Sequence, residues 1–170
     1  MFKEVKVMKQ EQKNRKIITS YIDSDMDGTS SMYAYAEFLR KKGENVQYYF
    51  EGKLKKEVEI VLKKFNIKLS SVSSINKDDE IILVDTNELN FLPKSIKQEQ
   101  IIEIVDHHPR RKWLENNNSV KCQIELIGAA ATMIAERYRN ENIEISKQSA
   151  ILLYYGIISN TMNLKIKLTS

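Results

Sequence analysis

Acidic residues and histidines, which readily bind divalent cations through oxygen and nitrogen, gather in short segments of this sequence. Three segments carry them: Asp23-Ser24-Asp25-Met26-Asp27-Gly28, Asp85-Thr86-Asn87-Glu88 and Asp106-His107-His108. Carboxylates packed side by side repel one another, so their convergence would be costly without a cation to neutralise them. Oxygen ligands suit Mg²⁺ and Mn²⁺, and imidazole tilts the preference toward Mn²⁺. The segments therefore predict a site for Mn²⁺ or Mg²⁺.

Each of the three segments follows a predicted strand. Apolar or β-branched runs predict strands over residues 16–22, 46–50, 80–84, 101–105 and 120–126. Helical periodicity predicts helices over residues 30–42, 54–65, 129–139 and 146–159. Strands that alternate with helices favour an α/β fold with a mostly parallel sheet, flanked by helices on both faces. Ligands of such a sheet bind beyond the carboxyl ends of the strands, where the three segments lie.

The only two histidines of the chain, His107 and His108, are adjacent. Neighbouring side chains of an extended segment point in opposite directions, so one histidine can face a cation while the other reaches a bound phosphate. Arg110, Arg111 and Lys112 follow, and these cations could neutralise charge on a leaving group. An ordinary solvated loop would account for the three basic residues equally well.

The first acidic segment also has a simpler interpretation. Asp23, Asp25 and Asp27 could form the acidic first turn of a helix, where carboxylates cap backbone N–H groups and favour the helix dipole. That role needs only one or two of the three acids. We favour a metal site, because it also explains Asp85 and the histidine pair.

The size and composition favour one folded domain. The chain has 170 residues, of which 42% are hydrophobic and 29% charged, as in a compact protein. The net charge is +4, but the lysines are spread along the chain, so charge does not identify a partner. The longest apolar run, residues 150–158, is far shorter than the roughly 20 residues that span a bilayer. Since the N-terminus carries no secretory signal, we expect a cytoplasmic protein without a membrane partner.

Five segments, taken in order, resemble the motifs of the DHH phosphoesterase superfamily. They are Asp25-Met26-Asp27-Gly28, Val84-Asp85-Thr86, Asp106-His107-His108, Gly128-Ala129-Ala130-Ala131-Thr132 and Gly156-Ile157-Ile158-Ser159-Asn160-Thr161. Each motif alone is weakly specific, whereas the ordered set covers almost the whole chain. Residues 84–89 and the ending from residue 159 look most similar to family II, manganese-dependent inorganic pyrophosphatases and to exopolyphosphatases. The first motif also resembles RecJ-type exonucleases and oligoribonucleases.

The resemblance implies a pair of Mn²⁺ (or Mg²⁺) ions and a set of ligands for them. It implies that Asp85 bridges the ions and that Asp25 binds one of them. Asp27 and His107 would bind the other ion. Asp23 would add a ligand if the chain follows the nuclease pattern.

The resemblance also implies roles around the ions, and it contains two departures. His108 would contact the substrate phosphate, and Asp106 would hold a histidine in position as a hydrogen-bond acceptor. Tyr21 stands where the pyrophosphatases carry a metal-binding histidine, and Asn160 stands where they carry a metal-binding aspartate. A neutral amide brings no negative charge, so we expect weaker binding of the second ion.

Three functions are compatible with this resemblance. The first is metal-dependent hydrolysis of a phosphoanhydride such as pyrophosphate or polyphosphate, with an activity that Tyr21 and Asn160 could impair. The second is phosphodiester hydrolysis on short or single-stranded nucleic acid or on a cyclic dinucleotide. The third is a binding module that has lost turnover. The partner is then a phosphate-containing small molecule or a short nucleic acid, and a homodimer is possible.

The resemblance finally implies a domain organisation. We expect residues 1–170 to form a single DHH catalytic domain. The C-terminal, substrate-binding domain of the superfamily would be absent or truncated.

Overall fold

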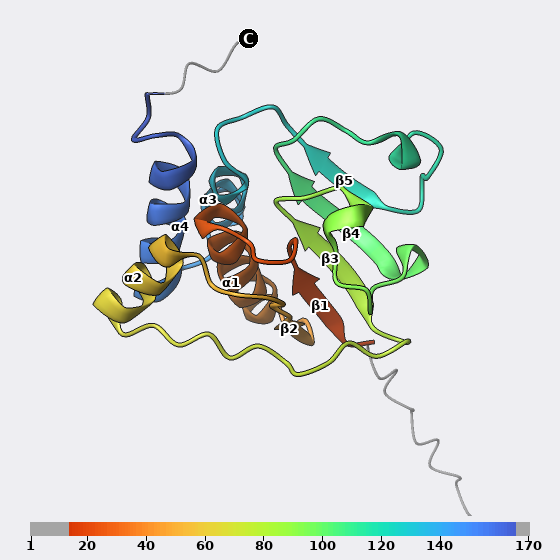
Figure 1. Cartoon of the computed structure of the whole chain (residues 1–170), viewed down its shortest axis with the longest axis horizontal. Coiled ribbons are helices and arrows are strands. Elements are labelled where there is room, and N and C mark those ends of the chain that lie inside the picture. Colours follow the sequence, from red (N-terminus) through yellow and green to blue (C-terminus); the bar gives the residue numbers. More distant parts are fainter. Residues whose placement is uncertain (1–13, 166–170) are drawn as a thin grey trace, which may run out of the picture.

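The computed structural model describes residues 14–165 and contains a parallel sheet of five strands in the order β2-β1-β3-β4-β5 (Figure 1). The strands are β1 (Lys16–Thr19), β2 (Val46–Tyr48), β3 (Glu80–Val84), β4 (Ile101–Asp106) and β5 (Lys121–Ile124). The α-helices are α1 (Met26–Lys41), α2 (Lys56–Phe65), α3 (Ala130–Asn140) and α4 (Lys147–Asn160). The predicted α/β class and parallel sheet are confirmed.

The register of the central strands brings their carboxyl ends side by side. Thr19 of β1 pairs with Leu83 of β3, and Val84 of β3 pairs with Val105 of β4. These strands are buried along most of their length, as expected for a parallel sheet covered on both faces. The segments that follow β1, β3 and β4 therefore start from one edge of the sheet.

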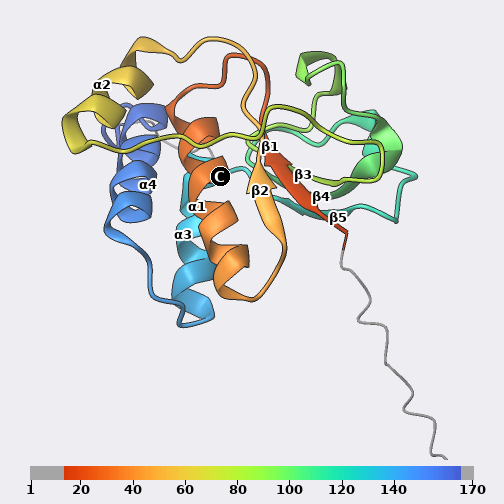
Figure 2. The ribbon, with the colours of Figure 1, turned by 90° about the horizontal axis from the view of Figure 1, so that it is seen from below.

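The two faces of the sheet are covered differently (Figure 2). Ile18, Ile82 and Val105 belong to a core shared with α1, α3 and α4, whereas Ile17 and Leu83 belong to a core on the other face, formed with the connecting segments. Three short 3₁₀ helices lie in these segments: η1 (Leu89–Phe91), η2 (Gln98–Gln100) and η3 (Lys112–Leu114). Helical turns thus lie on both faces, as predicted, but the α-helices gather on one. No helix within residues 14–165 is long and apolar enough to cross a membrane.

The first helix begins earlier than the sequence pattern indicates. The prediction began at Ser30, but α1 begins at Met26, because the Asp25 side chain caps its first turn. Gly28 therefore lies inside the helix instead of before it. A Cβ atom at Gly28 would lie 2.6 Å from the Ser20 hydroxyl oxygen and 3.1 Å from an Asp85 carboxylate oxygen, so glycine lets the helix approach the ends of β1 and β3.

Candidate metal centre

A cavity of about 550 Å³ opens at the carboxyl ends of β1, β3 and β4. It collects most of the site residues predicted from the sequence. Those that line it are Tyr21, Asp23, Asp25, Asp85, His107, His108, Arg111 and Asn160. The ordering of strands and helices therefore brings residues distant in the chain to one place.

Asp85 contributes the most deeply placed carboxylate of the site. It follows β3 directly, is 2% exposed and adopts a left-handed backbone conformation (φ 58°) that few residues other than glycine tolerate. Its buried Oδ1 atom has no hydrogen-bond partner among the described residues. Burial and the neighbouring Asp27 carboxylate raise the pKa of Asp85 well above its ordinary value. The site thus contains a buried acceptor whose charge can be compensated only by the neighbouring His107 ring or by a cation.

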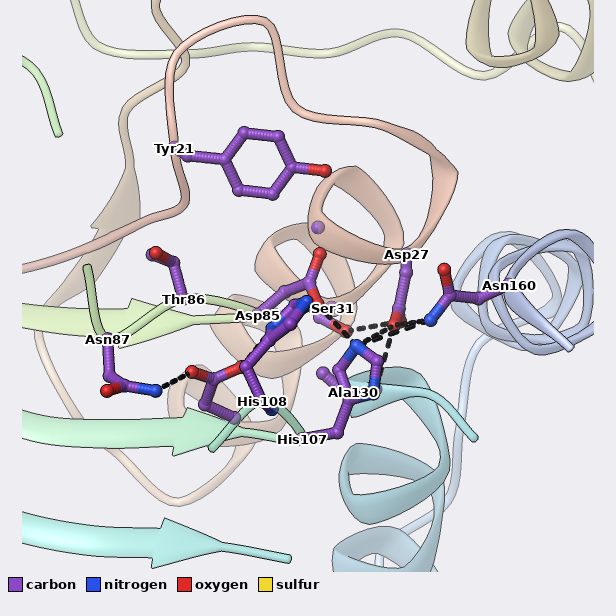
Figure 3. A network of polar contacts seen from close by, with 12 residues as sticks. Tyr21, Asp27, Ser31, Asp85, Thr86, Asn87, His107, His108, Ala130 and Asn160 are labelled. Carbon is purple, nitrogen blue, oxygen red and sulfur yellow. Dashed lines mark hydrogen bonds and ion pairs between the residues drawn. The ribbon is translucent and has the colours of Figure 1, made fainter. Parts of the chain in front are cut away.

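His107 points its free ring nitrogen at this oxygen (Figure 3). Its Nδ1 atom lies 3.0 Å from the carbonyl oxygen of Ile127, so Nδ1 carries the proton. The Nε2 atom lies 3.2 Å from Oδ1 of Asp85 and 3.7 Å from Oδ2 of Asp27. In a neutral imidazole Nε2 is an acceptor, and two acceptors this close need a proton or a cation between them.

The electrostatics of His107 agree with that requirement. Burial opposes a charged ring, but the carboxylates of Asp85 and Asp27 outweigh it and raise the pKa of His107 to about 9. A bound metal would displace this proton, since imidazole coordinates in its neutral form. The 3.2 Å separation also matches two neighbouring ligands of one ion, which lie roughly 3 Å apart when each bond is about 2.1 Å. The residues present therefore fit a divalent cation.

His108 lies beside the pair and is held by Asp106. Ligand atoms of Asp85, His107 and His108 lie within 4.8 Å of one another. Strand β4 ends at Asp106, so the alternation expected of an extended segment no longer separates the two histidines. The Nδ1 atom of His108 lies 2.8 Å from Oδ1 of Asp106, which leaves Nε2 free to face the cavity. Asp106 therefore lies where it can hold the His108 ring in position.

Asn87 is a residue of the site that the sequence interpretation missed. It is 1% exposed, and its side-chain amide donates to Asp106 Oδ2. Its side-chain oxygen accepts from the backbone N–H of Arg111 at 2.8 Å, and its carbonyl accepts from the indole of Trp113 at 2.8 Å. Burial opposes ionisation of Asp106, but hydrogen bonds from His108 and Asn87 outweigh it and lower its pKa. Its position two residues after Asp85 was the available signal.

Asp27 is buried and fully hydrogen bonded. The backbone N–H groups of Ala130 and Ala131, at the start of α3, donate to its two oxygens at 2.8 Å each. Burial raises the pKa of Asp27 to about 6, although these two hydrogen bonds oppose the rise. The side-chain nitrogen of Asn160 lies 3.2 Å from Asp27 Oδ2. Asp27 and Asn160 therefore lie in direct contact with each other.

The two remaining acids, Asp23 and Asp25, line the cavity, and one oxygen of each accepts from backbone N–H groups. Asp25 Oδ1 accepts from the N–H groups of Asp27 and Gly28, which is the capping role considered as the simpler interpretation. Asp23 accepts from the backbone N–H of Lys53, in the segment after β2. The hydroxyl of Tyr21 accepts from the Asp25 N–H at 3.2 Å. Burial and the nearby Asp85 and Asp25 carboxylates raise the pKa of this hydroxyl.

The three basic residues after the histidines separate. Arg111 lines the cavity and forms an ion pair with Glu88 at 2.9 Å. Arg110 turns toward the carbonyl oxygen of Leu114, and neither Arg110 nor Lys112 is among the residues that line the cavity. The structure therefore brings one of the three, Arg111, to the site.

Comparisons with known proteins agree with this arrangement. A probable manganese-dependent inorganic pyrophosphatase of Brevibacillus brevis is 32% identical over 153 residues, which cover 89% of this chain and 49% of that protein. A Methanococcus jannaschii protein assigned as a family II inorganic pyrophosphatase superposes with a TM-score of 0.77 at 28% identity, over 92% of this chain and 51% of that one. An exopolyphosphatase-related protein of Bacteroides fragilis shares the fold, with a TM-score of 0.66 at 16% identity over 92% of this chain and 49% of that one.

The chain spans about half the length of these relatives. Within it, the sequence pattern described as the DHH family, N-terminal domain, matches residues 16–157. That range includes all five strands, the carboxylates at their ends and the histidine pair. The chain belongs to the DHH family.

Proposed function

We propose that this chain is the metal-binding domain of a hydrolase that cleaves phosphoanhydrides such as pyrophosphate or polyphosphate with Mn²⁺ or Mg²⁺. The observation that carries the proposal is the buried, unpartnered Oδ1 of Asp85, 3.2 Å from Nε2 of His107. Only a proton or a cation relieves that arrangement. The relatives named as manganese-dependent inorganic pyrophosphatases support Mn²⁺ as the ion and pyrophosphate as the substrate class.

Under this proposal, the residues that line the cavity have different roles in binding the cation and the substrate. Asp85 and His107 hold the cation, and a bound divalent cation supplies an acidified water and polarises phosphoryl oxygens. His108 donates to a phosphate oxygen through Nε2, because Asp106 keeps the other ring nitrogen occupied. Arg111 offsets negative charge on the substrate at the cavity wall. The partner is thus a phosphate-containing small molecule.

The domain organisation that we propose follows the sequence prediction. Residues 1–170 act as a single catalytic domain, which corresponds to about half of the curated relatives. A homodimer and a cytoplasmic location stay predictions.

The test is phosphate release from pyrophosphate and from polyphosphate, with added Mn²⁺. We expect Asp85→Ala to lower the rate at least about 100-fold, because loss of a group that merely orients a ligand already costs 10–100-fold. The matched control is Asp78→Ala, which removes an exposed carboxylate that does not line the cavity and should leave the rate unchanged. Equal rates in the unmodified chain and in Asp85→Ala would contradict the proposal. So would cleavage of a short oligonucleotide or a cyclic dinucleotide with no phosphate release from either anhydride.

A further inference from the structure

Helix α2 is tied to the site by one side chain, although no residue of α2 lines the cavity. The carboxylate of Glu57 accepts hydrogen bonds from groups on two other helices. Its Oε1 atom accepts from the Met26 N–H at 3.2 Å, at the start of α1. Its Oε2 atom accepts from the Ser159 hydroxyl at 2.6 Å, near the end of α4. Glu57 therefore links two helix ends that carry residues of the site.

The first contact of Glu57 fixes the backbone between two acids of the site. Met26 lies between Asp25, which lines the cavity, and Asp27. The Asp27 carboxylate lies 3.7 Å from Nε2 of His107. Because the peptide bond is planar, an acceptor held on the Met26 N–H also fixes the carbonyl group of Asp25. The first N–H groups of a helix have no partner within the helix, so without Glu57 the start of α1 would lose this anchor.

The second contact of Glu57 fixes the end of α4. Ser159 directly precedes Asn160, which lines the cavity. The side-chain nitrogen of Asn160 lies 3.3 Å from Nε2 of His107 and 3.2 Å from Oδ2 of Asp27 (Figure 3). The distance between the end of α4 and the start of α1 therefore sets the space beside this Nε2 atom, where a cation must bind. Glu57 holds both helix ends, so it sets that distance from outside the cavity.

Apolar packing keeps α2 against these helix ends (Figure 2). Val58, the residue after Glu57, is fully buried in a cluster with Met26 and Leu152. Glu57 itself is exposed, and exposed contacts of charged side chains contribute little to stability. The apolar cluster therefore accounts for most of the stability of this packing. Replacing Glu57 should leave the fold intact and change the spacing of the two helix ends.

We propose that Glu57 is a positioning residue of the metal centre, whose two hydrogen bonds set the spacing between the start of α1 and the end of α4 around the bound cation. Glu57 does not line the cavity, so it acts through Met26 and Ser159. This inference rests on the proposed function, because it concerns the same site. The affinity for the cation does not depend on turnover, so it can be tested separately from the activity.

The decisive measurement is the dissociation constant of Mn²⁺, by a titration in which electron paramagnetic resonance detects the free ion. We expect Glu57→Ala to weaken Mn²⁺ binding about 10–100-fold, the usual effect of losing a group that orients a ligand. Glu57→Gln keeps an oxygen for the Met26 N–H and an amide that can donate to the Ser159 oxygen, so it should retain the affinity of the unmodified chain. Glu59→Ala is the matched control for loss of charge, because Glu59 is exposed on the same helix and its side chain pairs, within residues 14–165, only with Lys56.

Equal Mn²⁺ affinities in the unmodified chain and in Glu57→Ala would overturn the inference, because the two contacts would then be only structural. An equal loss of affinity in Glu57→Gln or in Glu59→Ala would also overturn it, because charge and not position would be the cause. If Glu57→Ala does not fold, Ser159→Ala decides. It removes one of the two contacts and should weaken Mn²⁺ binding, and an unchanged affinity would overturn the inference.

The inference and the proposed function fail in different ways. Mn²⁺ binding that weakens in Glu57→Ala, without phosphate release by the unmodified chain, would contradict the proposed function alone. Phosphate release with the same Mn²⁺ affinity in both chains would contradict the inference alone. No Mn²⁺ binding by the unmodified chain would contradict both.

Discussion

At the scale of single residues, Asn87 connects the histidine pair to the loop that carries Arg111. Its amide donates to the buried carboxylate of Asp106, which in turn orients His108. The same side chain accepts from the Arg111 N–H and also lies 3.3 Å from the Pro109 carbonyl oxygen. Asn87 touches neither Asp85 nor His107 through any hydrogen bond of the described residues. It is therefore a positioning residue, whose loss should spare the cation and disturb the substrate contacts.

We predict that Asn87→Ala lowers kcat for phosphate release about 10–100-fold, the usual effect of losing a group that orients a site residue. The number of bound Mn²⁺ ions should not change. Steady-state kinetics with Mn²⁺ and equilibrium dialysis measure the two quantities. Asn90→Ala is the control, because Asn90 lines the same cavity and its side chain makes, within residues 14–165, only a 3.5 Å contact with Glu88. An unchanged kcat in Asn87→Ala, or a loss of the ion, would contradict this role.

At the scale of elements, the close packing of α4 on α1 sets the position of Asn160. A Cβ atom at Gly156 would lie 2.2 Å from the Ser30 hydroxyl oxygen and 3.2 Å from the Ala131 Cβ atom. The three helices that carry these residues also supply Asp27, the N–H groups that bind it and Asn160. The absence of a side chain at Gly156 thus lets the end of α4 reach the site.

We predict that Gly156→Ala destabilises the chain by about 1–3 kcal/mol, the usual cost of adding a methyl group to a filled interior. The sign of this change in the free energy of unfolding is informative, because replacing glycine by alanine in an exposed helix would stabilise the chain by roughly 1 kcal/mol. Denaturant unfolding measures the change. The Ser30→Ala change removes the clashing hydroxyl. In a Ser30→Ala background, Gly156→Ala should therefore lower the free energy of unfolding less than it does in the unmodified chain. A more stable Gly156→Ala chain would contradict the packing argument.

The elements were largely predictable from the sequence, whereas the contacts between them were not. All five strands and four α-helices were predicted, because apolar runs and helical periodicity are local signals. The placement of acids and histidines after the strands also predicted one shared site. However, the partners of Asp27 lie 103 and 104 residues away, at the start of α3. No local pattern could show that these N–H groups compensate its charge, or that Asn160 turns its nitrogen inward.

At the scale of the whole molecule, the buried carboxylate of Asp85 should make the metal-free chain less stable than its packing allows, because only the His107 ring faces its Oδ1 atom. Burial and the Asp27 charge raise the pKa of Asp85, so keeping this carboxylate ionised in the folded state costs free energy. Binding sites commonly lower stability in this manner. A cation that binds only the folded chain should offset the cost. At a concentration 100-fold above its Kd, it adds about 2.7 kcal/mol to the free energy of unfolding.

We predict that Asp85→Asn removes both the lower stability of the metal-free chain and the stabilisation by a bound cation. In EDTA it should be more stable than the unmodified chain by about 1–3 kcal/mol, the range for relieving an unsatisfied buried polar group. Asparagine tolerates the left-handed conformation at this position nearly as well as aspartate, so the backbone adds little to the difference in stability.

With Mn²⁺ the unmodified chain should gain stability and Asp85→Asn should not. Denaturant unfolding with EDTA and with Mn²⁺ measures both quantities, and Asp78→Asn, at an exposed position, should behave like the unmodified chain. A metal-free Asp85→Asn chain less stable than the unmodified one would mean that the Asp85 carboxylate is already compensated without a cation.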